Sequence, residues 1–213
     1  MTDNEFLLQD RLQKIRSMNE LYDLEHNAYI SFSGGKDSTV LHKLIDLALP
    51  GNNIPRVFIN TGIEYKLVID FVKQERERDS RIVLLLPEKN VKEVLEKNGY
   101  PFKSKEHSHK WECWFKVGNS KWVYNYTNGG TRFTCPKVLM YQFSKEYKEN
   151  PNVVMSDACC YKLKKEPAHK YGMENNRRIV LTGMMKEEGG QRKNITCAVF
   201  DCKGRLEKFH PLL

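Results

Sequence analysis

A six-residue stretch, Ser-Gly-Gly-Lys-Asp-Ser at positions 33–38, combines the residue types that bind anionic groups. Gly34 and Gly35 let the backbone come close to a phosphate, and the free N–H groups of a helix that starts here would point at it. Lys36 adds a positive charge. The hydroxyls of Ser33 and Ser38 can donate hydrogen bonds, and Ser38 can also cap the helix. The stretch therefore predicts an anion-binding loop.

Asp37 is the exception in this stretch, because a carboxylate beside a phosphate repels it. Two roles remain for its side chain. It can accept hydrogen bonds from backbone N–H groups and so order the loop, or it can reach a bound Mg²⁺ ion. The second role makes Mg²⁺ a candidate cofactor of the site.

The elements on either side of the loop are those that an anion site needs. Residues 28–32 include aromatic and β-branched side chains, which indicates a strand, and residues 39–47 have apolar positions spaced for a helix packed on a sheet. A Gly-Gly turn with a lysine in solvent is the alternative. It is the weaker explanation when six specified residues stand between a strand and a helix.

The same alternation of strand and helix continues through most of the chain. Further strands are expected over residues 56–60, 81–86 and 178–183, with one short strand in 198–213. Helices are expected over residues 5–22, 65–77, from Asn90 (as N-cap) onwards and over 136–149. This order predicts an α/β fold, a parallel twisted sheet with helices on both faces.

Polar residues follow two other predicted strands and should share an edge with the loop, since ligands of open parallel sheets bind at the carboxyl ends of strands. Residues 60–64, Asn-Thr-Gly-Ile-Glu, follow the second strand. Gly183 ends the fourth, and the segment after it carries Lys186 and Arg192, which we expect to clamp a phosphate or sulfate.

Composition indicates a single globular domain of residues 1–213. Apolar residues make up 40% of the chain and charged residues 29%, and no apolar run approaches the length of a membrane span. The acidic N-terminus lacks the layout of a signal peptide, so we expect a cytoplasmic protein with no membrane partner. The net charge of +8 fits a polyanion or polyphosphate partner, or simply a lysine-rich surface in water.

The pattern breaks over residues 99–135, which are polar, basic and rich in aromatic side chains. Trp111, Trp114 and Trp122 all lie here. We expect a small irregular insertion that contains cysteine. It is interpreted either as a lid over the substrate or as a subdomain that packs its own aromatic side chains.

The chain has six cysteines, at positions 113, 135, 159, 160, 197 and 202. In a cytosolic protein they point to metal binding or redox chemistry rather than to disulfides. A buried small hydrophobe is the alternative for any single cysteine. It is a weaker explanation for the adjacent Cys159 and Cys160, because both side chains cannot easily share one buried face.

The loop resembles the PP-loop of the ATP pyrophosphatase superfamily, which holds the β- and γ-phosphates while ATP is cut between α and β. With four further segments, the chain from about residue 28 to residue 213 is similar to the phosphoadenosine phosphosulfate (PAPS) reductase family. The segments that carry this resemblance, besides residues 33–38, are 60–64, 157–167, 182–192 and 209–212.

The resemblance implies an adenine nucleotide alpha hydrolase-like, Rossmann-like fold and an adenine nucleotide, ATP or PAPS, as the ligand. The residues implied to bind the nucleotide are Ser31, Ser33, Gly34, Gly35, Lys36, Asp37, Ser38, Asn60, Thr61, Gly62, Glu64 and Gly183. The residues implied to act in catalysis are Lys36, Asp37, Lys186 and Arg192.

The Cys-Cys segment resembles the one that supplies two ligands of a [4Fe-4S] cluster in iron–sulfur members of the family. The resemblance thus makes Cys159 and Cys160 metal ligands, with Cys197 and Cys202 as the candidate second pair. The four residues between Cys197 and Cys202 differ from the two residues that usually separate the second pair of ligands in the family. Cys135 is a further candidate ligand. A zinc ion and unliganded thiols are the alternatives to the cluster.

The sequence also departs from the family pattern. Met185 stands near a position that is often arginine, and the chain ends where family members continue into helices with further cysteines, so that extension is expected to be absent. Reductases usually have a degenerate loop, so the intact loop favours ATP.

Three functions follow from these features. The first is an enzyme that cleaves a sulfonucleotide (PAPS or adenylylsulfate) with a thioredoxin-like reductant. The second is an enzyme that uses ATP to adenylate a nucleic acid for sulfur insertion. The third is a nucleotide-sensing module without turnover. We also expect a homo-oligomer.

Overall fold

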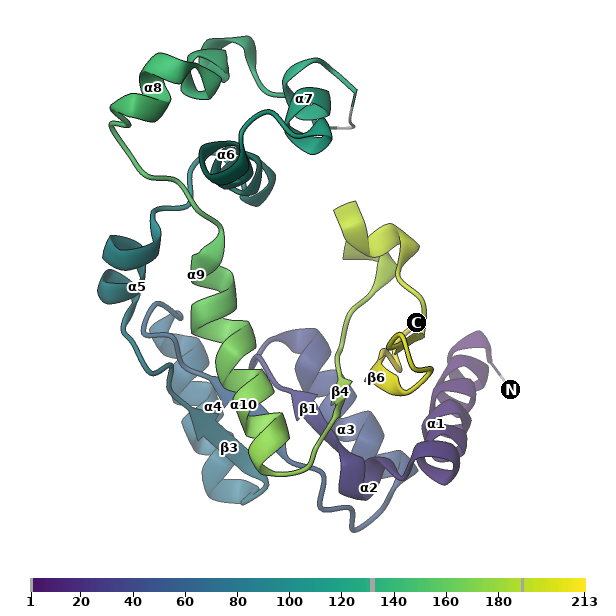
Figure 1. Ribbon diagram of the computed structural model, residues 1–213. Helices are drawn as coiled ribbons and strands as arrows, with labels where there is room; N and C mark the ends of the chain where they lie inside the picture. The colour runs from purple at the N-terminus through teal and green to yellow at the C-terminus, as the bar shows by residue number, and fades with distance from the viewer. Residues whose placement is uncertain (1, 131–132, 189) are drawn as a thin grey trace. The chain divides into compact units, whose positions relative to one another are not determined.

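The computed structural model describes residues 2–130, 133–188 and 190–213, and its chain divides into two compact units (Figure 1). The first unit combines Met1–Leu86 with Pro167–Leu213, and the second is Pro87–Glu166. The predicted insertion, residues 99–135, lies within the second unit. None of the helices in the described residues is long and apolar enough to cross a membrane.

The first unit is built on a sheet of six strands in the order β3-β2-β1-β4-β6-β5. All neighbouring pairs are parallel except β5 and β6, which are antiparallel. The strands are β1 (Ala28–Ser31), β2 (Arg56–Ile59), β3 (Ile82–Leu85), β4 (Ile179–Leu181), β5 (Ala198–Phe200) and β6 (Leu206–Phe209). The predicted α/β fold is confirmed, although the final segment folds into two strands where the sequence predicts one.

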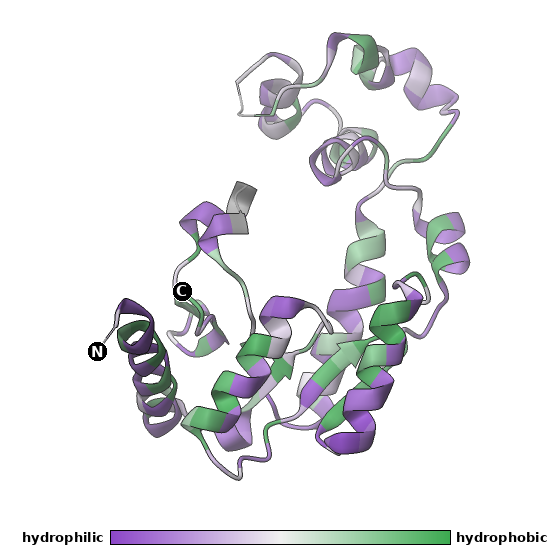
Figure 2. Cartoon of the chain, turned by 180° about the vertical axis from the view of Figure 1, so that it is seen from behind, coloured by the Kyte–Doolittle hydropathy of each residue, from purple (hydrophilic) through white to green (hydrophobic). Residues whose placement is uncertain are grey.

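Helices cover both faces of this sheet, as predicted. On one face α1 (Asp3–Tyr22) and α3 (Lys36–Ala48) bury an aliphatic cluster that includes Ile15, Ile45 and Leu181. On the other face Val72 of α4 (Lys66–Arg78) packs against Phe32 and Phe58. Hydrophobic and hydrophilic residues alternate along these helices (Figure 2), because one side of each faces the sheet and the other faces water. The helices of this unit are α1 (Asp3–Tyr22), α2 (Leu24–Asn27), α3 (Lys36–Ala48), α4 (Lys66–Arg78), α10 (Glu166–Glu174) and the 3-10 turns η3 (Lys186–Glu188) and η4 (Gly190–Asn194).

The second unit is helical and has a small aromatic core of its own. Trp111 is fully buried, stacks on Phe115 and contacts Tyr147 edge to face. Trp114 is also buried, whereas Trp122 is 70% exposed. The helices of the second unit are α5 (Val91–Asn98), α6 (Lys105–Val117), α7 (Lys121–Thr127), η1 (Lys137–Phe143), α8 (Lys145–Glu149), α9 (Ala158–Cys160) and the π-helix η2 (Tyr161–Lys165).

Helix starts in the second unit follow the capping rules. The Asn90 side chain accepts a hydrogen bond from the backbone N–H of Glu93, so the predicted N-cap of α5 is confirmed. Ser104 caps α6 and Ser120 caps α7 in the same way. A hydroxyl or amide oxygen at the N-cap satisfies a backbone donor that the helix itself cannot pair, which fixes where each helix begins.

Candidate functional site

The parallel strands bring the predicted site residues to one edge of the sheet. The loops after β1, β2 and β4 all leave from the carboxyl ends of parallel strands. From β1 the chain passes to β2 and β3 on one side, and β4 and β6 lie on the other side of β1. The order of strands therefore reverses at β1, which is where open α/β sheets bind their ligands.

The loop between β1 and α3 is held by its own serines. Ser33 Oγ lies 3.0 Å from Ser38 Oγ, and the Ser33 N–H donates to Ser38 Oγ at 3.2 Å. Ser38 Oγ also lies 2.9 Å from the Gly35 carbonyl oxygen, to which it donates. The prediction that Ser38 caps α3 is wrong, because the N-cap is Gly35 and no side chain caps the helix. The hydroxyl of Ser38 orders the loop instead.

The first turn of α3 points backbone donors out of the loop. Thr39 is the first residue whose N–H reaches back into the helix, to the Gly35 carbonyl at 3.0 Å. The N–H groups of Lys36, Asp37 and Ser38 precede it, and a helix has no partners of its own for its first N–H groups. The helix dipole adds partial positive charge at this end. With the exposed Lys36 side chain, this turn has what an anion-binding site needs.

Two glycines shape the loop where no other residue fits. Gly34 has φ of +71°, and a Cβ there would lie 2.8 Å from Val72 Cγ2 of α4. A Cβ on Gly183, just after β4, would lie 2.7 Å from the carbonyl oxygen of Asp37. The structure thus brings Gly183 against the loop, as predicted for the shared edge, and side-chain-free backbone on both sides sets how closely β4 and α3 approach.

The segment after β2 is folded on itself. The backbone N–H and the hydroxyl of Thr61 each donate to the Glu64 carboxylate, both at 2.8 Å. The Gly62 N–H donates to Asn60 Oδ1 at 3.0 Å. Thr61 is buried. These residues therefore give the turn beside the loop a fixed shape, and their binding of a nucleotide stays a prediction.

Three other predicted residues are exposed at or beyond this edge. Ser31 is the last residue of β1, Lys186 belongs to η3 and Arg192 to η4, both of which follow β4. The chain from β4 to these turns is seen in Figure 1 as the yellow-green segment. The structure brings Gly183 to the loop, and the roles of Ser31, Lys186 and Arg192 in binding or catalysis stay predictions.

A buried histidine at the same edge was missed as a site residue. His210 follows β6, is 1% exposed, and its Nδ1 lies 2.6 Å from Thr182 Oγ1, just after β4. Burial lowers the pKa of His210, and the nearby Lys208 lowers it further. The signal was available, because His210 follows a predicted strand in one of the segments that carry the family resemblance. The pair ties the ends of β4 and β6 together next to Gly183.

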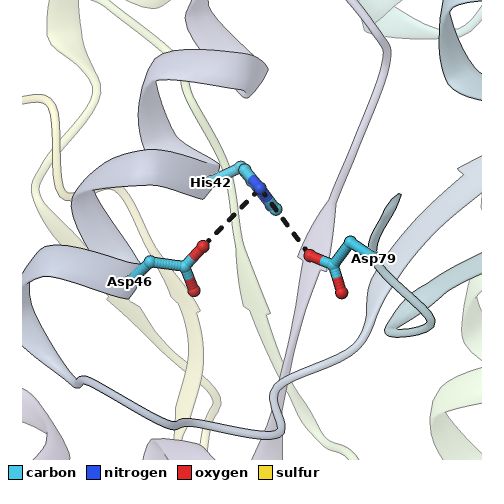
Figure 3. Close-up of side chains that lie close together, drawn as sticks. All are labelled: His42, Asp46 and Asp79. Carbon is cyan, nitrogen blue, oxygen red and sulfur yellow. Dashed lines mark ion pairs between the residues drawn. The ribbon is translucent and has the colours of Figure 1, made fainter. Parts of the chain in front are cut away.

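A charged cluster lies farther along α3 (Figure 3). His42 and Asp46 sit one turn apart on the helix, and Asp79 faces them from the segment before β3. The distances from His42 Nε2 are 3.6 Å to Asp46 Oδ2 and 3.8 Å to Asp79 Oδ2. His and carboxylate side chains at this spacing are potential metal ligands, and the other partners of these side chains decide whether they could bind an ion.

Two arginines already neutralise both carboxylates of this cluster. Arg56, which is fully buried, donates to Asp46 at 2.6 Å and to His42 Nδ1 at 3.0 Å. Arg81 donates to Asp46 and to Asp79, both at 2.8 Å. Because Nδ1 of neutral His42 accepts, Nε2 carries the proton and offers no lone pair to a metal. The cluster is therefore structural.

The pKa shifts in this cluster have consistent causes. Burial lowers the pKa of His42, and Arg56 lowers it further. For Asp79, burial alone would raise the pKa, but hydrogen bonds from Arg81 outweigh it and lower the value to about 2. Burial lowers the pKa of Arg56 to about 10. The carboxylates are thus held charged and the histidine neutral, which matches the hydrogen bonds.

The predicted metal ligands are divided between the two units. Cys159 and Cys160 lie in α9 of the second unit, and Cys197 and Cys202 lie in the first. Cys197 Sγ donates to the His210 carbonyl oxygen at 3.6 Å, and burial raises its pKa. Within residues 87–166, no three of the described cysteine sulfurs gather at ligand distance. The ligand set of a cluster or a zinc ion therefore stays a prediction.

A cavity of about 580 Å³ lies away from the loop. Its lining includes Tyr29 and Val180 from the sheet, Gly172 from α10 and Arg178 before β4, but no residue of 33–38. The cavity therefore does not belong to the anion-binding loop.

Comparisons with known proteins identify the family of the chain. The family model of the phosphoadenosine phosphosulfate reductase domain matches residues 27–134, half of the chain. The protein MJ0973 of Methanocaldococcus jannaschii is 42% identical over 73 residues, which are 34% of this chain and 17% of that protein. The matched segment thus spans well under two thirds of this relative.

Among solved structures, the phosphate complex of phosphoadenylyl-sulfate (PAPS) reductase from Candida auris is similar, with a TM-score of 0.45 and 16% identity. The match covers 88% of this chain and 65% of that one. The family model includes β1, the loop 33–38 and the turn after β2. The chain belongs to the phosphoadenosine phosphosulfate reductase domain family.

Proposed function

We propose that this protein binds an adenine nucleotide with the anionic tail of the nucleotide at residues 33–38, and that it carries out sulfur chemistry on that nucleotide. The observation that carries the proposal is the first turn of α3. This turn follows β1, where the order of strands reverses, and a Cβ on Gly183 would lie only 2.7 Å from the carbonyl oxygen of Asp37. Membership of the phosphoadenosine phosphosulfate reductase domain family supports an adenine nucleotide as the ligand and sulfur chemistry as the reaction.

The residues of the loop have distinct roles in this proposal. The amides of the first helical turn and the Lys36 ammonium bind phosphate or sulfate oxygens. The two serine hydroxyls hold the loop in shape, since they are bonded to each other and to Gly35. Asp37 lies in the first turn of α3, where a carboxylate can reach a Mg²⁺ ion that the nucleotide brings.

Lys186 and Arg192 follow Gly183 and supply the positive charge that the leaving group needs, which is the nucleotide phosphate in sulfonucleotide cleavage and pyrophosphate in adenylation. A fixed cation near the bond that breaks stabilises the charge that develops there. The turns η3 and η4 would have to present these side chains to the loop when the nucleotide is bound, so both residues belong to the proposal as its catalytic cations.

Two reactions fit the site. The family favours reductive cleavage of a sulfonucleotide, PAPS or adenylylsulfate, with a thioredoxin-like protein as the reductant. The complete Ser-Gly-Gly-Lys-Asp-Ser loop favours the second candidate, in which ATP adenylates a nucleic acid before sulfur insertion and pyrophosphate leaves. The net charge of +8 agrees with a nucleic-acid substrate.

A cluster ligated by Cys159 and Cys160 remains part of the proposal for the whole protein, with zinc as the alternative. Iron and zinc analysis of protein purified without oxygen tests this part separately from nucleotide binding.

Isothermal titration with ATP and with PAPS, each with and without Mg²⁺, tests the binding proposal. We expect one of the two to bind and to lose affinity in Lys36→Ala but not in Lys43→Ala, whose lysine is exposed on the same helix. Sulfite release with a thiol reductant supports the reductase, and pyrophosphate release supports the adenylating enzyme. Binding without either product supports a sensing module, and no binding of either nucleotide overturns the proposal.

A further inference from the structure

Three side chains of the second unit form a chain of contacts that the proposed function does not use. Cys113 Sγ lies 3.7 Å from His109 Nε2, and His109 Nδ1 lies 3.3 Å from Asp157 Oδ1. Cys113 and His109 are one turn apart on α6, and Asp157 directly precedes α9. A thiol, an imidazole and a carboxylate in this order are the parts of an activated nucleophile.

The protonation of the histidine follows from its two neighbours. A carboxylate can only accept, so His109 Nδ1 donates its proton to Asp157 when the imidazole is neutral. Nε2 then carries a lone pair directed at the thiol of Cys113. The imidazole can therefore take the thiol proton as the sulfur attacks, and Asp157 stabilises the imidazolium that forms.

A hydrogen bond to α6 holds Asp157 in place. Ser156 is buried, and its hydroxyl donates to Glu112 Oε2 on α6 at 2.8 Å. Glu112, the sequence neighbour of Cys113, also pairs with Lys116 one turn on. Its carboxylate is thus engaged on both sides. The segment 156–157 is tied to the helix that carries His109 and Cys113, so the three side chains stay together.

The three groups are also open to a reagent. The His109 side chain is 55% exposed and that of Asp157 is 22% exposed. Cys113 is half-buried. By contrast, Cys135 is buried and its thiol donates to a carbonyl oxygen, and burial raises its pKa. The second unit therefore contains one inert thiol, that of Cys135, and one thiol with a base beside it, that of Cys113.

We propose that Cys113 is a nucleophilic thiol that exchanges with disulfides, with His109 as its general base and Asp157 as the residue that positions His109. In this step the Cys113 sulfur forms a bond to one sulfur of the disulfide, and the S–S bond of the disulfide breaks. The thiol proton moves to His109 Nε2 and then to the departing thiolate. The products are a mixed disulfide on Cys113 and a free thiol, so no further oxidant or reductant is needed.

The test uses the whole protein and 4,4′-dithiodipyridine, a small neutral disulfide. Thiopyridone release gives the rate, and mass spectrometry of tryptic peptides gives the site. Cys202, which is exposed and lies in the other unit, is the internal control. We expect Cys113 to react faster than Cys202 at neutral pH. His109→Ala should slow Cys113 by about tenfold or more and leave Cys202 unchanged.

Imidazole added to the His109→Ala protein separates a base from a merely structural residue, because it should restore part of the Cys113 rate. Asp157→Asn should give a smaller loss than His109→Ala, and Asp157→Glu should recover part of it. The Asp157 side chain does not cap α9, so these variants remove no helix cap. The proposal is overturned if Cys113 reacts no faster than Cys202, if His109→Ala leaves its rate unchanged, or if Cys113 is found bound to a metal.

Discussion

Helix α3 carries polar residues in its first turn and again near its middle, and the two groups are used in opposite ways. In the first turn, Ser38 bonds to Ser33 of the preceding loop, while the helix has no internal partners for its leading N–H groups. Further along, His42 and Asp46 face Arg56 and Arg81, and hydrogen bonds join all four to one another or to neighbouring backbone.

The difference shows how a binding site can be told from a structural cluster. His42, Asp46 and Asp79 have the residue types of a metal site, yet two arginines take up their charge. The loop has fewer charged groups, but its donors are backbone amides for which the helix itself has no partners. Unused bonding capacity, rather than the number of charged residues, marks the ligand site, and four variants can test this comparison.

The largest effect is expected when the saturated cluster is broken. Asp46→Ala leaves the guanidinium of Arg56 buried without its closest carboxylate, and should lower the free energy of unfolding by about 3–5 kcal/mol. Denaturation in urea measures it. Lys43→Ala, an exposed lysine on the same helix, is the matched control and should change stability by less than about 0.5 kcal/mol. A loss below about 1 kcal/mol for Asp46→Ala would mean that the cluster is not structural.

The opposite result is expected in the first turn of α3. Lys36→Ala should weaken nucleotide binding by about 1.5–3 kcal/mol, because a charge-assisted contact is lost. Its unfolding free energy should stay within about 0.5 kcal/mol of the parent protein, since the Lys36 side chain is exposed. Titration calorimetry and urea denaturation of the same sample measure both. Unchanged affinity would refute Lys36 as a phosphate ligand.

A smaller effect is expected from the turn that precedes α3. Gly34→Ala should destabilise the protein by about 1–2 kcal/mol, because φ is +71° and the new Cβ would meet Val72. Gly51→Ala is the matched control, with φ of +78° and no atom within 4 Å of the new Cβ. The excess loss in Gly34→Ala measures the contact with α4. Equal losses in the two variants would show that only backbone strain matters.

The smallest effect concerns pH. Burial lowers the pKa of His42 in the folded protein, so the unfolded chain binds the proton at higher pH. The free energy of unfolding should therefore fall as the pH drops below about 6.5, the usual pKa of histidine. His107 and His210 shift in the same direction, so the comparison of the parent with His42→Gln isolates one residue. Urea midpoints from pH 8 to pH 5 should fall less in His42→Gln, and identical slopes would contradict the assignment.

Local patterns predicted the elements well because local physics fixes them. The helix over residues 65–77 and the N-cap at Asn90 depend on neighbours within one turn, and both appear within a residue or so of the prediction. The prediction of Ser38 as the cap of α3 is wrong. Ser38 is the third residue of the helix, and the general preference for hydroxyls near a helix start does not distinguish this position from the N-cap. Only the folded loop shows that its hydroxyl bonds to Ser33 and Gly35.

Long-range partners could not be predicted from the sequence. The residues near His42 in the sequence do not predict that Arg56 and Arg81 bind this cluster, because these arginines come from β2 and from the segment before β3. His109 and Asp157 are 48 positions apart, and their contact depends on how α6 packs. The sequence alone did establish the strand–loop–helix unit of residues 28–48, because glycine, charge and periodicity act within a few residues. Tertiary structure alone decided which polar groups are saturated and which are open, because that depends on side chains that meet only when distant segments pack together.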